Sequence, residues 1–308
     1  MLSLLQTEYL EHPMTSRIPR IPHPQGSLVL GLMLAVLLAS TARAGDWPGF
    51  LGPLRNGISA ETGLLDTFPT TGPKVAWRVA AGVGMSGLAV ADGRVVTMVE
   101  SNGQQQVWAL DFASGKVLWK STVARAYRNG MGNGARATPM IAGDTVVAFT
   151  GEGLLVVMEV KTGAVRWSRN VVKSLKGQVA DYGMACSPLV VGEMVVVTPG
   201  APGAAVAAFG LQDGTQIWTA ADGPAGYSSP ALIKAGGRLQ VVAFLGDKAV
   251  GLDPDRGTPI WNYPYKTDYD CNIATPLLHK GRVFLSSGEN HGSVMLELKK
   301  TGTGLAPS

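Results

Sequence analysis

The sequence predicts an all-β protein, a β-propeller of four-stranded antiparallel blades. The first observation is a short motif, clearest at 109–119 (Ala-Leu-Asp-Phe-Ala-Ser-Gly-Lys-Val-Leu-Trp), in which a Gly lies four residues before a Trp. Its Gly–Trp pairs are Gly115–Trp119, Gly163–Trp167, Gly214–Trp218 and Gly257–Trp261. The tryptophans follow one another at intervals of 48, 51 and 43 residues. A motif that recurs every 40–50 residues or so (about one blade) is typical of propellers and solenoids.

The second observation is the pattern within each repeat, which indicates four short strands. Asp92-Gly93, for example, separates two apolar runs, and this is a strong signal for a β-hairpin. Lys74–Val79 resembles the last strand of one more repeat, with Trp77 lying 42 residues before Trp119. We therefore expect a propeller over 74–308, with blades at about 86–119, 138–167, 187–218 and 229–261 and an incomplete one at 275–308.

Composition and charge agree with this fold class and exclude others. The chain is 46% hydrophobic and 16% charged, with 40 Gly and 19 Pro, as expected for a β protein rich in tight turns. Its net charge of +4 is spread along the chain without a basic run, so we expect no nucleic-acid binding. Two cysteines are too few for a disulfide scaffold or a zinc cluster.

The N-terminus has the pattern of a signal peptide. An uncharged apolar run at 27–39 follows Arg17 and Arg20 and precedes Ala42-Arg-Ala44. The run is shorter than the roughly 20 residues of a membrane span. We expect export to the periplasm or beyond after cleavage of 1–44, with no stable membrane span remaining, although an uncleaved anchor is an alternative. No Cys lies directly after the apolar run, where a lipid would be attached.

The segment 45–73 is rich in Gly and Pro but too apolar for a free linker. We expect it to lie across the body of the protein as a strap. The apolar side chains that suggest this are Trp47, Phe50, Leu51, Leu54, Leu64, Leu65 and Phe68.

An acidic residue lies four positions before the motif glycine in three of the four repeats. These are Asp111, Glu159 and Asp253, and the third repeat has Gly210 there instead. A carboxylate at this position can accept hydrogen bonds from the N–H groups of its own turn. We interpret these acids as turn caps, and we expect the third turn to be held less firmly.

These repeats resemble the tryptophan-docking repeats of the pyrroloquinoline-quinone-like (BamB-like) β-propeller family. The opening Trp47-Pro-Gly-Phe-Leu-Gly-Pro53 is similar to the start of secreted, uncharacterised members. The resemblance covers about 74–308 and is specific for fold rather than activity. It implies that the motif tryptophans and Trp77 pack against a neighbouring blade. It also implies a closed ring of seven or eight blades, so we expect this chain to be a piece of a longer protein.

A ligand site, if there is one, is expected where the segments before each inner strand gather at one mouth of the channel. Their candidate ligand-binding residues are Arg136, Cys186, Tyr227, Asp270 and Asn272. Well-packed turns between blades are the alternative interpretation. A disulfide between Cys186 and Cys271 is open, because connections two blades apart would strain the required Cα separation.

No catalytic pattern stands out, and we assign no catalytic residue and no metal site. His279 and His291 are not spaced as a zinc pair, and no nucleophile elbow is present. Quinone-dependent dehydrogenases of the family carry adjacent cysteines beside pyrroloquinoline quinone (PQQ) and a calcium site, and neither can be placed on this chain. We therefore expect no cofactor.

The interpretation that follows is an exported, non-catalytic propeller that serves as an interaction or assembly scaffold for other exported or envelope proteins. The alternative is a partial or degenerate quinoprotein, resembling the PQQ-dependent dehydrogenases, that still binds a small ligand at the channel mouth.

Overall fold

The computed structural model describes residues 45–288, 290–302 and 304–308. The expected signal peptide at 1–44 therefore lies outside the described residues. In the part of the chain that is described, no helix is long and apolar enough to cross a membrane.

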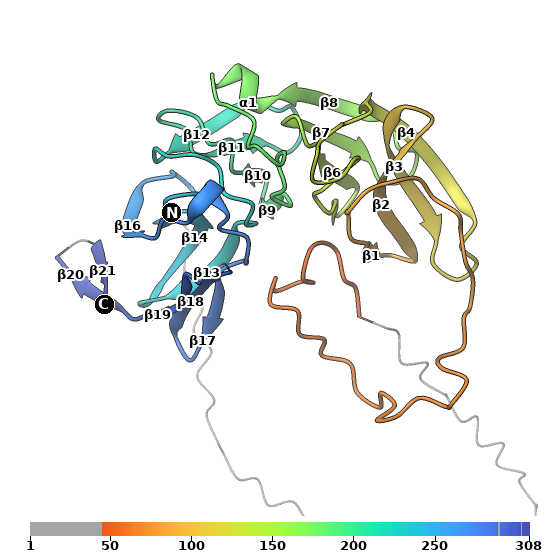
Figure 1. The fold of residues 1–308 in the computed structure, drawn as a ribbon, viewed down its shortest axis with the longest axis horizontal. Helices are drawn as coiled ribbons and strands as arrows, with labels where there is room; N and C mark the ends of the chain where they lie inside the picture. The colour runs from red at the N-terminus through yellow and green to blue at the C-terminus, as the bar shows by residue number, and fades with distance from the viewer. Residues whose placement is uncertain (1–44, 289, 303) are drawn as a thin grey trace, which may run out of the picture. The chain divides into compact units, whose positions relative to one another are not determined.

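Four antiparallel sheets of four strands follow one another along the chain, each with its strands in sequence order (Figure 1). The first two comprise β1 (Ala89–Ala91), β2 (Arg94–Ser101), β3 (Gln104–Asp111), β4 (Val117–Arg125), β5 (Met140–Ala142), β6 (Thr145–Phe149), β7 (Leu154–Glu159) and β8 (Val165–Asn170). The next two comprise β9 (Leu189–Val191), β10 (Met194–Val197), β11 (Val206–Gly210), β12 (Gln216–Ala220), β13 (Ala231–Ala235), β14 (Arg238–Phe244), β15 (Lys248–Leu252) and β16 (Pro259–Pro264).

The fifth repeat forms a three-stranded sheet and a separate hairpin. The sheet comprises β17 (Leu277–His279), β18 (Arg282–Ser287) and β19 (Gly292–Leu296), and the hairpin pairs β20 (Leu298–Thr301) with β21 (Gly304–Pro307). The only helical turns among the described residues are α1 (Val171–Ser174) and the 3₁₀ turn η1 (Asp268–Asp270). The fold class predicted from the sequence is thus confirmed as nearly all-β, with propeller-type four-stranded sheets that do not close a barrel.

The hydrophobic core lies between consecutive sheets. Side chains alternate between the two faces of a strand, so adjacent residues of one strand pack against different neighbouring sheets. Val195 and Val197 of β10 pack with the second sheet, whereas Val196 packs with the fourth. The first strands β1, β5, β9, β13 and β17 also contact one another in that order. We call the region where these first strands meet the hub.

The motif tryptophans join each sheet to the next at the other end of the blades. Trp119 donates its indole N–H to the carbonyl of Val160 at 3.0 Å, and its ring covers Gly163 so closely that a Cβ there would lie 2.5 Å from it. The same arrangement links Trp77 to Phe112 and Gly115, Trp167 to Leu211 and Gly214, and Trp218 to Pro254 and Gly257. Each glycine also has a positive φ, so both its conformation and its lack of a side chain are required.

Trp261 differs from the other tryptophans. Its indole N–H donates to the Oε1 of Gln240 within its own sheet. At Gly302, where the fifth turn would lie, an added Cβ would meet nothing within 4 Å. The hairpin of β20 and β21 instead packs its Leu298 and Leu305 into the core around Trp261.

The turn acids have the capping role expected from the sequence, with one change. Asp111 accepts hydrogen bonds from the N–H and hydroxyl of Ser114, at 2.9 and 2.6 Å, and these bonds lower the pKa of its carboxyl. In the third turn, Asp213 accepts the corresponding bonds from Thr215 at 2.9 and 2.7 Å. A Cβ on Gly210 would lie 2.5 Å from this carboxylate. Gly210 therefore leaves space for Asp213, which caps the third turn in place of an acid at position 210. The expectation that this turn is held less firmly is wrong.

One further expectation is wrong, and another holds for part of its segment. Lys74–Val79 does not form a strand, although Trp77 within it docks on the first sheet. The strap lies across the body only in its first half, since Trp47, Phe50 and Leu51 are partly buried. Its later apolar residues Leu54, Leu64, Leu65 and Phe68 are exposed by 64–77%.

Candidate functional site

The hub is crossed by residues 45–55, which we call the hub strap. Trp47 exchanges two backbone hydrogen bonds of 2.7 Å with Val90 of β1. The carbonyl of Pro48 then accepts a 2.7 Å bond from the N–H of Ile141 in β5. The strap therefore runs from the first strand of one sheet to the first strand of the next.

The strap ends with Arg55, whose side chain is only 5% exposed. One guanidinium nitrogen donates to the carbonyls of Ser187 at 3.1 Å and Pro230 at 2.9 Å, and the other donates to the carbonyl of Pro188. Ser187 and Pro188 lead into β9, and Pro230 leads into β13. One buried cation thus ties the third and fourth sheets to a strap that already holds the first two.

The charge of Arg55 has no counterion among the described residues, since none of their ion pairs includes it. Burial lowers the pKa of its guanidinium to about 10. Three carbonyl oxygens compensate part of the lost hydration, because hydrogen bonds are stronger in a region of low dielectric constant.

Cys186, one of the expected ligand residues, lies near Arg55 and not with the other candidates. Its sulfur is buried and accepts a bond from the backbone N–H of Thr198 at 3.5 Å. Burial raises the pKa of the Cys186 thiol, so this cysteine is a poor nucleophile. No disulfide joins Cys186 to Cys271 in the structure.

Arg136 and Tyr227 are brought together through Tyr182. Arg136 donates from its Nε to the carbonyl of Tyr182. The rings of Tyr182 and Tyr227 stack with centroids 5.5 Å apart, and the Tyr227 hydroxyl accepts from the Tyr182 N–H at 3.2 Å. Burial raises the pKa of Tyr227 to about 12. Tyr127 completes the group, with its ring centroid 4.5 Å from the Arg136 guanidinium carbon.

The donors of Arg136 are committed to the protein's own backbone. Besides the bond to Tyr182, its two terminal nitrogens donate to the carbonyls of Gly134 at 2.7 Å and Gly132 at 2.8 Å. Desolvation by burial lowers the pKa of Arg136. This arginine therefore shapes the 129–136 loop.

Asn272 is fully buried and serves the fold in the same way. Its side-chain nitrogen donates to the carbonyls of Leu245 at 2.6 Å and Tyr265 at 2.9 Å, and its Oδ1 accepts from the hydroxyl of Thr267. Its own carbonyl accepts the N–H groups of Tyr227 and Ser228, both at 2.9 Å. All its polar groups are satisfied by neighbouring loops.

Asp270 is the remaining candidate, and it is partly exposed. It has a positive φ of 55°, and its side chain contacts Gly246. Desolvation raises the pKa of its carboxyl, and the neighbouring negative charge of Asp247 adds to the effect. Asp270 carries the only carboxylate of the five candidates, and it is partly exposed.

Arg55, Tyr127 and Tyr182 are not among the residues that the sequence indicates as candidates. Arg55 had a weak signal, as a single cation in the apolar first part of the strap. Within the residues that the structure describes, no group of three His, Cys, Asp or Glu side chains could hold a metal ion.

Arg55 and Arg136 do not fit an acidic, planar quinone cofactor. Such a ligand needs cationic donors that point into its site, and the guanidinium groups of Arg55 and Arg136 donate to backbone carbonyls instead. Cys186 and Cys271 are both free, and they differ in burial, so they do not form the adjacent pair that the dehydrogenases place beside their quinone.

The repeats match those of a known family. A family model described as outer membrane protein assembly factor BamB matches residues 66–181 and 128–304, which together exceed half of the chain. The chain belongs to this BamB-like family of PQQ-type repeats. Among curated proteins, none matches it significantly.

Solved structures agree with the fold. BamB from Moraxella catarrhalis is 20% identical, with a TM-score of 0.56 over 76% of this chain and 67% of its own. A quinohemoprotein alcohol dehydrogenase from Comamonas testosteroni is 15% identical, with a TM-score of 0.55 over 85% of this chain and 47% of its own. A similar enzyme from Pseudomonas putida HK5 is 16% identical, with a TM-score of 0.54 over 83% and 45%. The chain thus spans about two thirds of that BamB and less than half of either dehydrogenase.

Proposed function

We propose that this BamB-like protein is an exported, non-catalytic propeller that binds other exported or envelope proteins. The observation that carries the proposal is that polar side chains at the hub and in the loops between blades bond the protein's own backbone. Arg55, Arg136 and Asn272 bond to backbone carbonyls, which leaves few groups to position a substrate. A site of this composition holds blades together better than it binds and transforms a small molecule.

Export and an envelope location are supported by two independent observations. The sequence at 27–39 has the length and flanks of a signal peptide. The family model is named for an outer membrane protein assembly factor. Shared fold does not establish shared partners, and the partners of this chain are part of the proposal.

The first experiment is chemical cross-linking of the full chain in its native host, followed by purification and mass spectrometry of the captured proteins. We expect envelope or exported proteins to be captured. A matched variant that lacks 1–44 should remain inside the cell and capture none of them. Capture of the same proteins by both forms, or of no protein by the full chain, would contradict the proposal.

The second experiment tests catalysis directly. We expect the purified protein, supplied with PQQ and calcium, to show no dye-linked oxidation of alcohols. Oxidation that depends on added quinone would overturn the non-catalytic assignment.

A small ligand at the mouth is the second candidate function, and the stacked rings of Tyr182 and Tyr227 favour it. An exposed edge of such a stack can bind a flat apolar group. Arg136→Ala and Asp270→Ala should each weaken such binding. Ligand binding that is unchanged in both variants would refute this alternative.

A further inference from the structure

The segment after the hub strap, residues 56–75, is an exposed apolar loop. Its five large apolar side chains are Ile58, Leu64, Leu65, Phe68 and Val75, each between 61% and 69% exposed. Leu65 and Phe68 line one pocket together, and exposed apolar patches mark interaction surfaces on soluble proteins.

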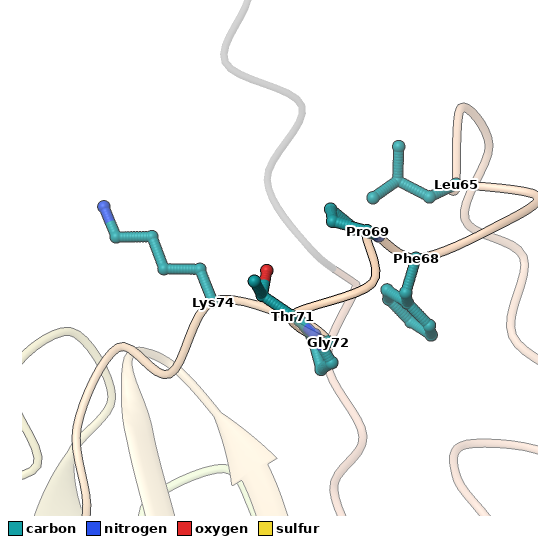
Figure 2. A pocket seen from close by; sticks show the side chains of 7 residues that line it. Leu65, Phe68, Pro69, Thr71, Gly72 and Lys74 are labelled. Atoms are coloured by element: carbon teal, nitrogen blue, oxygen red, sulfur yellow. The ribbon is translucent and has the colours of Figure 1, made fainter.

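Both ends of this apolar loop are fixed to the body. Arg55 holds its start in the hub through three buried hydrogen bonds, and Trp77 holds its end against the first sheet. An anchored segment loses less conformational entropy on binding than a free one. Figure 2 shows a pocket whose lining, from Leu65 to Lys74, comes from the loop alone. The loop therefore presents apolar groups without a partner element of its own.

The charge of the apolar loop restricts what it can bind. Between 56 and 75 its charged residues are Glu61, Asp66 and Lys74, all exposed, so the loop has a net charge of −1 and its two carboxylates lie before its one cation. An anionic lipid surface would repel the carboxylates, and so would a phosphate backbone. The loop fits a protein surface that is apolar with a basic rim.

The fifth sheet offers such a surface. Its register aligns Leu277 of β17, Phe284 of β18 and Met295 of β19 in one row, and Met295 is 37% exposed. Lys280 in the turn between β17 and β18, and Arg282 at the start of β18, are exposed cations.

We propose that the apolar loop of one copy docks on the fifth sheet of a second copy. Leu65 and Phe68 would cover the row of Phe284 and Met295, and Asp66 would approach Arg282. The two surfaces differ, so the contact is head-to-tail, and it produces either a ring or a growing chain of copies. This self-association is independent of the scaffold role proposed above.

Sedimentation velocity of the purified protein at increasing concentration tests the proposal. We expect the mass to rise with concentration, and the association to weaken at high salt because charges contribute to it. Asp66→Lys and Arg282→Glu should each weaken association by about tenfold or more in Kd, since like charges then face each other. Asp255→Lys makes the same charge change in an exposed turn and should have no effect.

Mixing the two interface variants gives the decisive result. A loop with Asp66→Lys complements a sheet with Arg282→Glu, and the unchanged Asp66 of the second variant complements the unchanged Arg282 of the first. The mixture should therefore associate about as well as the parent protein, although each variant alone associates weakly. A protein that stays monomeric at all concentrations would overturn the proposal. Association that neither substitution weakens, or a mixture that fails to associate, would overturn it as well.

Discussion

Replacing Arg55 with Met tests whether one buried cation holds the hub together. Met keeps an unbranched side chain of similar length but has no donor. Arg55 adopts φ of 50°, and a non-glycine replacement has comparable backbone strain, so the change isolates the guanidinium. The substitution leaves the carbonyls of Ser187, Pro188 and Pro230 without this donor.

The size of the effect follows from two opposing contributions. Hydrogen bonds to a charged group contribute about 1.5–3 kcal/mol each, and three are lost. Against this, the pKa of Arg55 falls from 12.5 to about 10 on burial, which corresponds to a cost of about 3 kcal/mol for holding the charge there. We expect Arg55→Met to lower the free energy of unfolding by about 2–5 kcal/mol, in line with other broken buried polar contacts.

Urea denaturation followed by tryptophan fluorescence measures this change. Arg256→Met is the matched control, because Arg256 is exposed in a turn, and it should stay within about 0.5 kcal/mol of the parent. The apolar loop should also become more susceptible to protease in Arg55→Met, since its start is released. A variant as stable as the parent, with an equally protected loop, would refute the role given to Arg55.

The remaining predictions concern the blades and the mouth. Trp218→Ala should cost about 3–5 kcal/mol of unfolding free energy, as for other buried tryptophans, and a loss under about 1 kcal/mol would contradict docking. Gly163→Ala should destabilise more than Gly143→Ala in urea denaturation: both glycines have positive φ, but only Gly163 lies under Trp119. Equal losses would show that backbone strain alone matters. Asp270→Asn should stabilise the protein at pH 7, because burial raises the pKa of Asp270 and makes its charge unfavourable. The gain should shrink as pH falls through the raised pKa of Asp270, and it should vanish below about 4, where the folded and the unfolded chain both bind the proton. Lower stability of this variant at pH 7 would contradict the argument.

The parts of the fold that the sequence predicts are those set by local patterns. The offset between Gly163 and Trp167 places a turn and a strand within one short segment, so one repeat suffices to define both. The capping acids are also local, since Asp111 bonds Ser114 only three residues away. The expectation of a weaker turn at Gly210 is wrong because Asp213, a carboxylate within the same turn, accepts the capping bonds instead.

The hub could not be predicted, because its contacts join residues far apart in the chain. Arg55 bonds carbonyls that are 132 and 175 residues away, and backbone carbonyls leave no trace in a sequence. Arg136 lies between β4 and β5 and Asn272 between β16 and β17, in connections between blades. Residue type alone does not reveal that their side chains donate to the protein's own backbone. An arginine looks the same in a sequence whether it binds a ligand or its own main chain.

These contacts divide the molecule into a part where long polar side chains bond the protein's own backbone and a part where apolar side chains lie exposed. At the hub and mouth, long polar side chains satisfy carbonyls where strands begin, as a buried backbone requires. At the apolar loop the reverse holds, because Leu65 and Phe68 are exposed while the flanking Arg55 and Trp77 are fixed. Binding energy comes mainly from apolar side chains that become buried when a partner arrives. The loop therefore has more free energy to gain from a partner than Arg55 and Arg136 have, since their donors already bond backbone carbonyls.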